Sequence, residues 1–250
     1  MKVLQIALLL APAFVASQAF AQANPNNPAL SNGASVTDEI INLSSGGYYS
    51  TALQFDNRYK GVKGSPFLWD AWSPGTLYLS DTVRVATPLM FKMDVYTNEV
   101  WTKDAIAQEI ILYSHQFRAL DLQHLDGSTW KFRKVITPGQ PDPHRFYHML
   151  YEGRRFSLYE DLYKTIKRAD YQDRGLYTSG STDDAFVERQ KIWLITDKQA
   201  AQEISLKKKA LLQALPPADA DRAAAYCKLH GLKGKVSEAE AVRLLEYLDK

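Results

Sequence analysis

Strand-like segments follow one another at short intervals through the middle of the chain, and this spacing constrains the fold more than any other feature. The clearest is 88–96, where Leu89, Phe91 and Met93 alternate with other residues, Lys92 among them. A period of two is typical of a half-buried strand. Such segments recur about every 8 to 15 residues without a helical pattern between them. Strands joined this directly pair antiparallel, so we expect a mainly β domain, either a sandwich or an open barrel.

The other expected strands are 100–103, 106–112, 116–122, 130–136, 145–151 and 186–196. Turns are expected at 97–99 and at Asp126-Gly127, because Asp-Gly is a strong tight-turn signal. Segment 154–170 fits both a strand period and a helical spacing. We favour a strand there, since Gly153 closes the preceding strand tightly. Residues 170–184 are predicted to form a polar loop.

The C-terminal part has a helical pattern. Residues 206–214 repeat apolar positions at intervals of four, and Pro217 is well placed as the first residue of a second helix that Gly231 ends. Ser237 and Glu240 have the spacing of a capping box, in which each side chain binds the other's backbone amide. We therefore expect a tail of three helices.

The first residues have the composition of a secretory signal peptide. Lys2 precedes an apolar run over 3–15, and small residues close the segment at Ala21-Gln22-Ala23. The run is too short for a membrane span, which needs roughly 18 residues or more. We expect residues 1–23 to be removed on export to the periplasm or the extracellular space, leaving no transmembrane anchor.

The expected organisation is thus in four parts. It comprises a signal peptide (1–23), a flexible Pro- and Gly-rich lead (24–36), a β-rich domain (37–204) and a helical tail (205–250). Ordered structure is expected to begin near 37–43, and 48–55 is prone to form a strand.

Charge and cysteine content narrow the possible partners. The formal net charge of the whole chain is +2, and removal of Lys2 with the signal peptide lowers it by one. A near-neutral chain gives no indication of a nucleic-acid partner. Cys227 is the single cysteine, so no disulfide forms within the chain, and its alanine-rich surroundings favour a buried thiol. We expect no cofactor.

Several segments together carry a resemblance to a known group. Gly64-Ser-Pro-Phe-Leu, the segments 74–78 and 88–100, and Tyr151-Glu-Gly resemble a group of exported proteins common in Bacteroidetes-type bacteria. The resemblance covers most of residues 64–250. It implies a strand over 154–170 and a helical tail. The group has no assigned activity, so the resemblance implies no catalytic residue.

The familiar catalytic patterns are weak in this sequence. His144 and His148 are four residues apart, but the His-Glu-x-x-His motif is absent and a catalytic zinc needs three protein ligands. Ser205 has the Ser-x-x-Lys spacing to Lys208, yet we expect it to cap the helix that follows. We predict no catalytic and no metal-binding residue.

Trp69 and Trp72 are the candidate ligand-binding residues. They lie between Pro66 and Pro74 in a loop-like setting, where they could form an aromatic platform for a sugar ring, although aromatic side chains more often pack in a β core. Trp101 is expected in the core.

The function predicted from these features is that of a non-enzymatic envelope module that binds a ligand or partner, either a glycan or another envelope protein. The alternative is a glycan-directed hydrolase that uses a carboxylate pair, whose separation the sequence leaves open.

Overall fold

The computed structural model describes residues 58–80, 83–85, 89–103, 107, 109–112, 114, 117–135, 142–173, 178–197 and 201–250. The expected signal peptide (1–23), the lead (24–36), the predicted start of order at 37–43 and the β-prone segment 48–55 lie outside the described residues.

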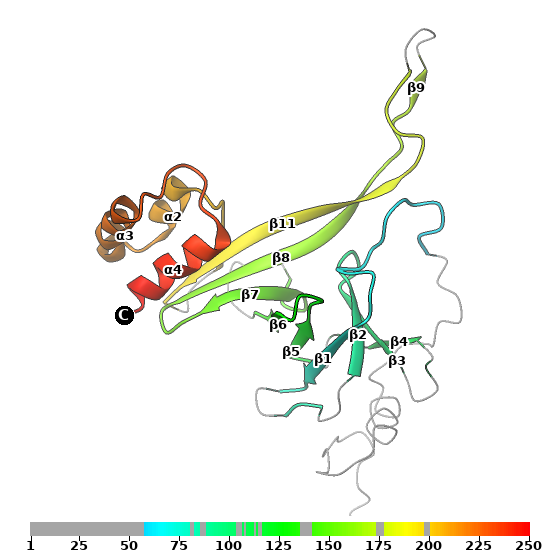
Figure 1. Cartoon of the computed structure of the whole chain (residues 1–250), viewed down its shortest axis with the longest axis horizontal. Helices are drawn as coiled ribbons and strands as arrows, with labels where there is room; N and C mark the ends of the chain where they lie inside the picture. Colours follow the sequence, from blue (N-terminus) through cyan, green and yellow to red (C-terminus); the bar gives the residue numbers. More distant parts are fainter. Residues whose placement is uncertain are drawn as a thin grey trace, which may run out of the picture.

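The described part is mainly β, as predicted (Figure 1). Within it, ten strands form one antiparallel sheet in the order β12-β11-β8-β7-β6-β5-β1-β2-β3-β4, and β9 and β10 form a separate two-stranded sheet. The sheet is continuous and open, not a sandwich of two large sheets. The strands are β1 (Ser73–Tyr78), β2 (Leu89–Asp94), β3 (Glu99–Lys103), β4 (Glu109–Leu112), β5 (Ala119–Gln123), β6 (Thr129–Lys134), β7 (Phe146–Glu152), β8 (Phe156–Lys167), β9 (Gln172–Asp173), β10 (Thr178–Ser179), β11 (Ala185–Thr196) and β12 (Ala201–Ile204).

The prediction of a strand over 154–170 is confirmed by β8. All twelve residues of β8 pair with β11, from Phe156 opposite Thr196 to Lys167 opposite Ala185. The helical spacing arose because both faces of β8 are covered near its start: Leu158 is buried on one face and Tyr159 on the other. When both faces of a strand are buried, apolar residues are not confined to alternate positions, so the period of two that distinguishes a strand is lost.

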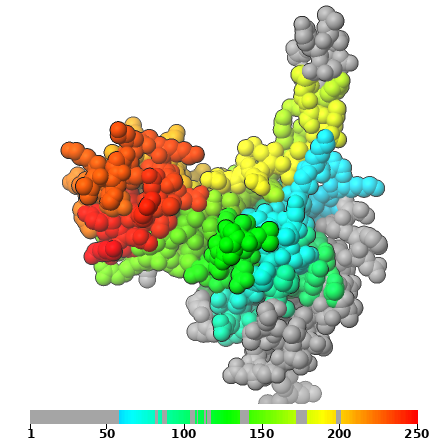
Figure 2. Space-filling view, in the orientation of Figure 1, coloured from blue at the N-terminus to red at the C-terminus, as the bar shows by residue number. Residues whose placement is uncertain are grey.

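The far end of this hairpin leaves the body of the protein. The ribbon of β8 and β11 continues into β9 and β10, and both views show it projecting away from the rest of the sheet (Figures 1 and 2). The predicted polar loop 170–184 is therefore the end of a long β ribbon.

One face of the sheet, here called the core face, carries the two larger hydrophobic clusters. Alternating side chains on β1 to β7, with loop residues such as Phe117, form the larger cluster around Leu77, Phe91 and Phe132. On β8, β11 and β12 the same face packs against the helices, where Leu158 and Leu194 meet helical leucines. On the opposite face a smaller cluster holds Tyr147, Tyr159, Trp193, Ile195 and Ala201.

The helical tail has the predicted form. Among the described residues the helices are α2 (Lys208–Ala214), α3 (Pro217–Leu229) and α4 (Glu238–Leu248). Pro217 is the first residue of α3, and Gly231 takes the positive φ of 66° that favours glycine after a helix end. Cys227 is buried between the helices and the sheet, as expected. No helix in the described ranges is long and apolar enough to cross a membrane.

Two local predictions need correction. Ser205 does not cap a helix: α2 begins at Lys208, and its N-cap is Lys207, which makes no side-chain cap. The strand β12 was not predicted, since Ala-Gln-Glu-Ile has little β preference. It forms because Ala201 and Ile204 lie opposite Ile195 and Ile192 of β11 and are buried there.

The capping box at Ser237 gives a direct test of the tail. Its Oγ accepts from the Glu240 amide at 3.3 Å, while the Glu240 carboxylate accepts from the Ser237 amide at 2.8 Å. We expect Ser237→Ala to lower the free energy of unfolding by about 1 kcal/mol, measured by urea denaturation. The exposed Ser205→Ala is the matched control and should leave stability unchanged, since Ser205 caps nothing. Equal effects of the two changes would contradict this assignment.

Candidate functional site

The segment 64–72 lies between two strands that are far apart in the sequence. The Leu68 amide donates to the Met93 carbonyl at 2.8 Å, and the Val95 amide donates to the Pro66 carbonyl at 3.1 Å. These bonds attach the segment to the end of β2. Its other side is attached to β8 by a side chain.

That side chain is Lys164. Its ammonium group donates to the Ser65 carbonyl at 2.9 Å and to the Phe67 carbonyl at 2.6 Å, and the side chain is only 10 % exposed. Hydrogen bonds from a charged donor are stronger than neutral ones, more so when shielded from water. Lys164 therefore fixes segment 64–72 against the hairpin.

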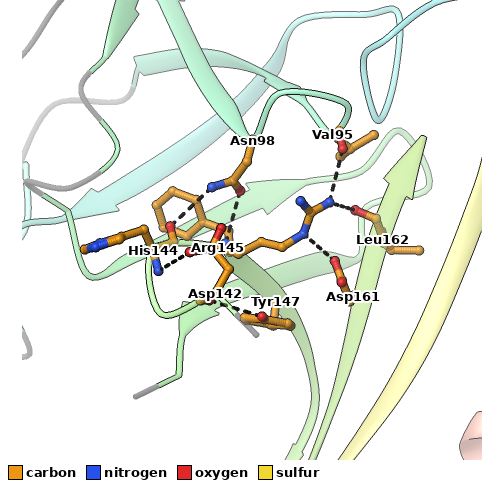
Figure 3. A network of polar contacts seen from close by, with 9 residues as sticks. Val95, Asn98, Asp142, His144, Arg145, Tyr147, Asp161 and Leu162 are labelled. Carbon is orange, nitrogen blue, oxygen red and sulfur yellow. Dashed lines mark hydrogen bonds and ion pairs between the residues drawn. The ribbon is translucent and has the colours of Figure 1, made fainter. Parts of the chain in front are cut away.

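A second contact, made by Arg145, joins the same parts of the sheet. Its Nε lies 2.5 Å from Oδ1 of Asp161, and its Nη2 donates to the carbonyls of Val95 and Leu162 at 3.3 and 3.5 Å (Figure 3). Asn98 lies at the β2–β3 turn, and its Oδ1 accepts a hydrogen bond from the Phe146 amide at 3.1 Å. The turn after β2 is thus held against β7 and β8 by side chains, across strands that do not pair.

A groove of about 350 Å³ lies at this junction. One wall is aromatic, with Trp69 and Trp130 at a ring-centre distance of 5.3 Å and an angle of 79°. The other wall is the hairpin, with Leu162 at its base and the polar Glu188 and Gln190 along its rim. Nearly perpendicular aromatic planes opposite hydrogen-bonding groups have the chemistry that a ligand with both apolar and polar faces requires.

Behind the aromatic wall lies a buried polar pair. The His148 ring stacks on Trp130, with centres 4.2 Å apart and planes within 10°, and its Nδ1 lies 3.1 Å from Glu160 Oε2. The two polar side chains are 12 % and 5 % exposed. Burial raises the pKa of Glu238 in the first turn of α4, and the nearby carboxylate of Glu160 raises it further. Trp130 is thus fixed from behind by a histidine that is itself held in place.

The candidate tryptophans Trp69 and Trp72 have different surroundings. Trp69 is half-buried against the larger core cluster and forms part of the groove wall. The centre of its ring lies 4.7 Å from that of His124. Trp72 instead lies between Lys92 and Lys103, whose ammonium nitrogens are 5.4 and 4.7 Å from the centre of its ring. They do not form the common platform that the sequence suggested. Trp101 is 2 % exposed, which confirms its predicted place in the core.

Sequence reasoning missed Trp130 and the hairpin residues. Trp130 lies opposite Leu122 in the ladder between β6 and β5, which places it on the core face. Its position soon after the Asp126-Gly127 turn was the available signal, because a tight turn fixes the register of the strands beside it. Gly127 has the positive φ of 85° expected at such a turn.

The other candidate groups have structural surroundings. His144 lies in the turn before β7, where its amide donates to Asp142 at 2.8 Å, and it does not share a strand with His148. Across the described ranges, no group of three His, Cys, Asp or Glu side chains could hold a metal ion. Among the carboxylates, buried Asp94 accepts hydrogen bonds from the amides of its own turn, and burial raises its pKa.

No family model, curated protein or solved structure gives a match to this chain. The arguments about its function therefore come from the geometry of the groove and from the sequence.

The attachment by Lys164 can be measured. Lys164→Met keeps the apolar stem but leaves two backbone carbonyls without their charged donor, so we expect the free energy of unfolding to fall by about 2 kcal/mol. Lys191→Met on β11 is the control, because its ion pair with Glu203 is solvent-exposed and should contribute less than about 1 kcal/mol. Urea denaturation followed by tryptophan fluorescence would measure both; a loss no larger than the control's would contradict the attachment.

Proposed function

We propose that the protein is an exported envelope protein that binds a carbohydrate chain, without cleaving it, in the groove between Trp69 and Trp130. The observation that carries the proposal is the pair of tryptophan planes at 79° facing the polar rim of the β8–β11 hairpin. The signal-peptide pattern of residues 1–23 supports the export part of the proposal.

The chemistry of the groove fits a sugar better than a purely apolar ligand. A pyranose ring has an apolar face that packs on an indole, and hydroxyl groups at its edge that require hydrogen-bond partners. Glu188 and Gln190 are exposed on the rim and offer both donors and acceptors. A volume of about 350 Å³ is at the lower end of the usual range for ligand pockets, which suits a few sugar units of a longer chain.

The geometry favours binding over hydrolysis. Among the described residues that line the groove, Glu188 is the single carboxylate, and Glu160, behind the aromatic wall, is 4 % exposed and already bound to His148. A glycosidase needs two carboxyl groups on either side of the scissile bond. A buried, partnered Glu160 supports Trp130 and does not face a substrate.

Binding is tested with soluble fragments of bacterial envelope glycans, by isothermal titration calorimetry. We expect Trp69→Ala to weaken binding of the recognised fragment by about tenfold or more, since stacking on an aromatic ring contributes on the order of 1–2 kcal/mol. Trp72→Ala is the matched control, because Trp72 lies beside Lys92 and Lys103 away from the groove. Circular dichroism confirms that each variant is folded.

Two results would overturn the proposal. The first is equal binding by the wild type and Trp69→Ala, or no binding to any fragment. The second is turnover of a glycan that is lost in Glu188→Gln, which removes the carboxylate in the groove and would establish the alternative, a hydrolase.

The proposal that the protein is exported can be tested separately. The mature chain should begin at Asn24, because the small residues Ala21 and Ala23 fit a cleavage site between positions 23 and 24. The intact mass of the protein recovered from the periplasm or medium of the producing bacterium measures this. Recovery of a chain that still carries residues 1–23 from the cytoplasm would contradict it.

A further inference from the structure

A second and larger cavity, of about 750 Å³, lies away from the groove. Its position follows from the side chains that alternate along the strands on the face opposite the core face. In the ladders, Tyr78 on β1 lies opposite Ala119 on β5, which in turn lies opposite Arg133 on β6. The one small side chain in this row leaves a space that its larger neighbours surround.

Basic side chains dominate the lining. Of the described residues that line it, the basic ones are Arg118, Arg133, Lys134, Arg154 and Arg155, and Glu152 is the single acidic one. Arg155 is already neutralised, since it makes a bidentate pair with Asp219 and a further bond to Asp197. The described lining therefore carries more basic than acidic side chains.

Arg133 is held in position for a ligand. Its Nη1 lies 2.6 Å from Oδ1 of Asp121 and donates to the Phe132 carbonyl at 2.9 Å, and its guanidinium lies 5.6 Å from the centre of the Tyr78 ring. The Tyr78 hydroxyl donates to the other oxygen of Asp121 at 3.1 Å, so this carboxylate is held on both sides. Both of these hydrogen bonds use Nη1, and within the described residues Nε and Nη2 have no acceptor.

We propose that this cavity binds a small molecule that carries more than one anionic oxygen, a phosphate ester or a polycarboxylate, with Arg133 as the central anchor. A guanidinium edge matches two oxygens of such a group at once. The volume is within the range of cavities that enclose a small-molecule ligand. Arg154 is exposed at the entrance and adds a second positive charge.

Lys134, also among the lining residues, directs its side chain to the core face, because it lies two residues from Phe132 on β6 and opposite Phe146 on β7. Its ammonium donates to the Ser114 carbonyl and lies 4.8 Å from the centre of the Phe146 ring. Burial lowers its pKa to about 8, while Asp142 acts in the opposite direction. Its ammonium is thus engaged on the core face, and the proposal for the cavity rests on the arginines.

The test uses two probes, inorganic pyrophosphate and citrate, in calorimetric titrations of the full mature chain at low ionic strength. Binding of pyrophosphate alone would identify a phosphate site, binding of citrate alone a carboxylate site, and either supports the proposal. Arg133→Gln should weaken binding by about tenfold or more, because it removes the bidentate donor. Arg154→Gln should weaken binding less, and its exposed position avoids any effect on folding.

Lys131→Gln is the matched control. Lys131 is exposed and lies two residues from Arg133, on the same strand and the same face, but it does not line the cavity. The substitution therefore removes the same charge from outside the cavity. We expect its affinity to stay within about twofold of the wild type. Absence of binding by both probes would overturn the proposal, as would an equal loss in Lys131→Gln and Arg133→Gln.

Discussion

The ladder between β8 and β11 is the feature on which the rest of the described structure depends. Twelve residue pairs hold these two strands together, and the pairing runs from the helical tail to the projecting ribbon. Near the tail, Leu158 and Leu194 face the helices while Tyr159 and Trp193 face the other way. Farther along, the same strands provide Leu162 and Gln190 to the groove. A shift of one residue in this register would exchange the two faces and remove all of these contacts.

Three cationic side chains attach the other parts of the protein to this hairpin. Lys164 on β8 binds the segment that carries Trp69, and Arg145 binds Asp161 of β8 and the β2–β3 turn. Arg155, next to the start of β8, forms its bidentate pair with Asp219 of α3, which is only 4 % exposed on its side chain. Each donor has several acceptors, as a partly buried charge requires. The hydrophobic clusters drive the packing of the strands and helices. These charged contacts fix the positions at which segments distant in sequence meet.

Local patterns predicted the elements well and their assembly poorly. Alternation in 88–96 and the capping box at Ser237 depend on neighbours within a few residues, so β2 and α4 could be predicted. Strand β12 forms through its pairing with β11, and the start of α2 at Lys208 leaves Ser205 without a capping role. Neither outcome depends on the neighbouring residues in the sequence alone. The site follows the same division. Trp69 was a candidate because its own segment is unusual, whereas Trp130 becomes part of the groove only through the ladder with β5 and the attachment of segment 64–72.

The strand β6 links the two proposed sites because consecutive side chains on a strand point to opposite faces. Trp130 and Phe132 lie on the core face, where Trp130 forms the groove wall, while Arg133 lies on the other face, in the basic cavity. The groove offers aromatic surface and exposed polar groups, and the cavity offers excess positive charge, so each suits a different ligand chemistry. Since both rest on the same rigid strand, a ligand on one face can influence the other only by changing the pairing of β6 with its neighbours. Ladders with five pairs to β5 and three to β7 oppose such a change, so the two sites should bind their ligands independently.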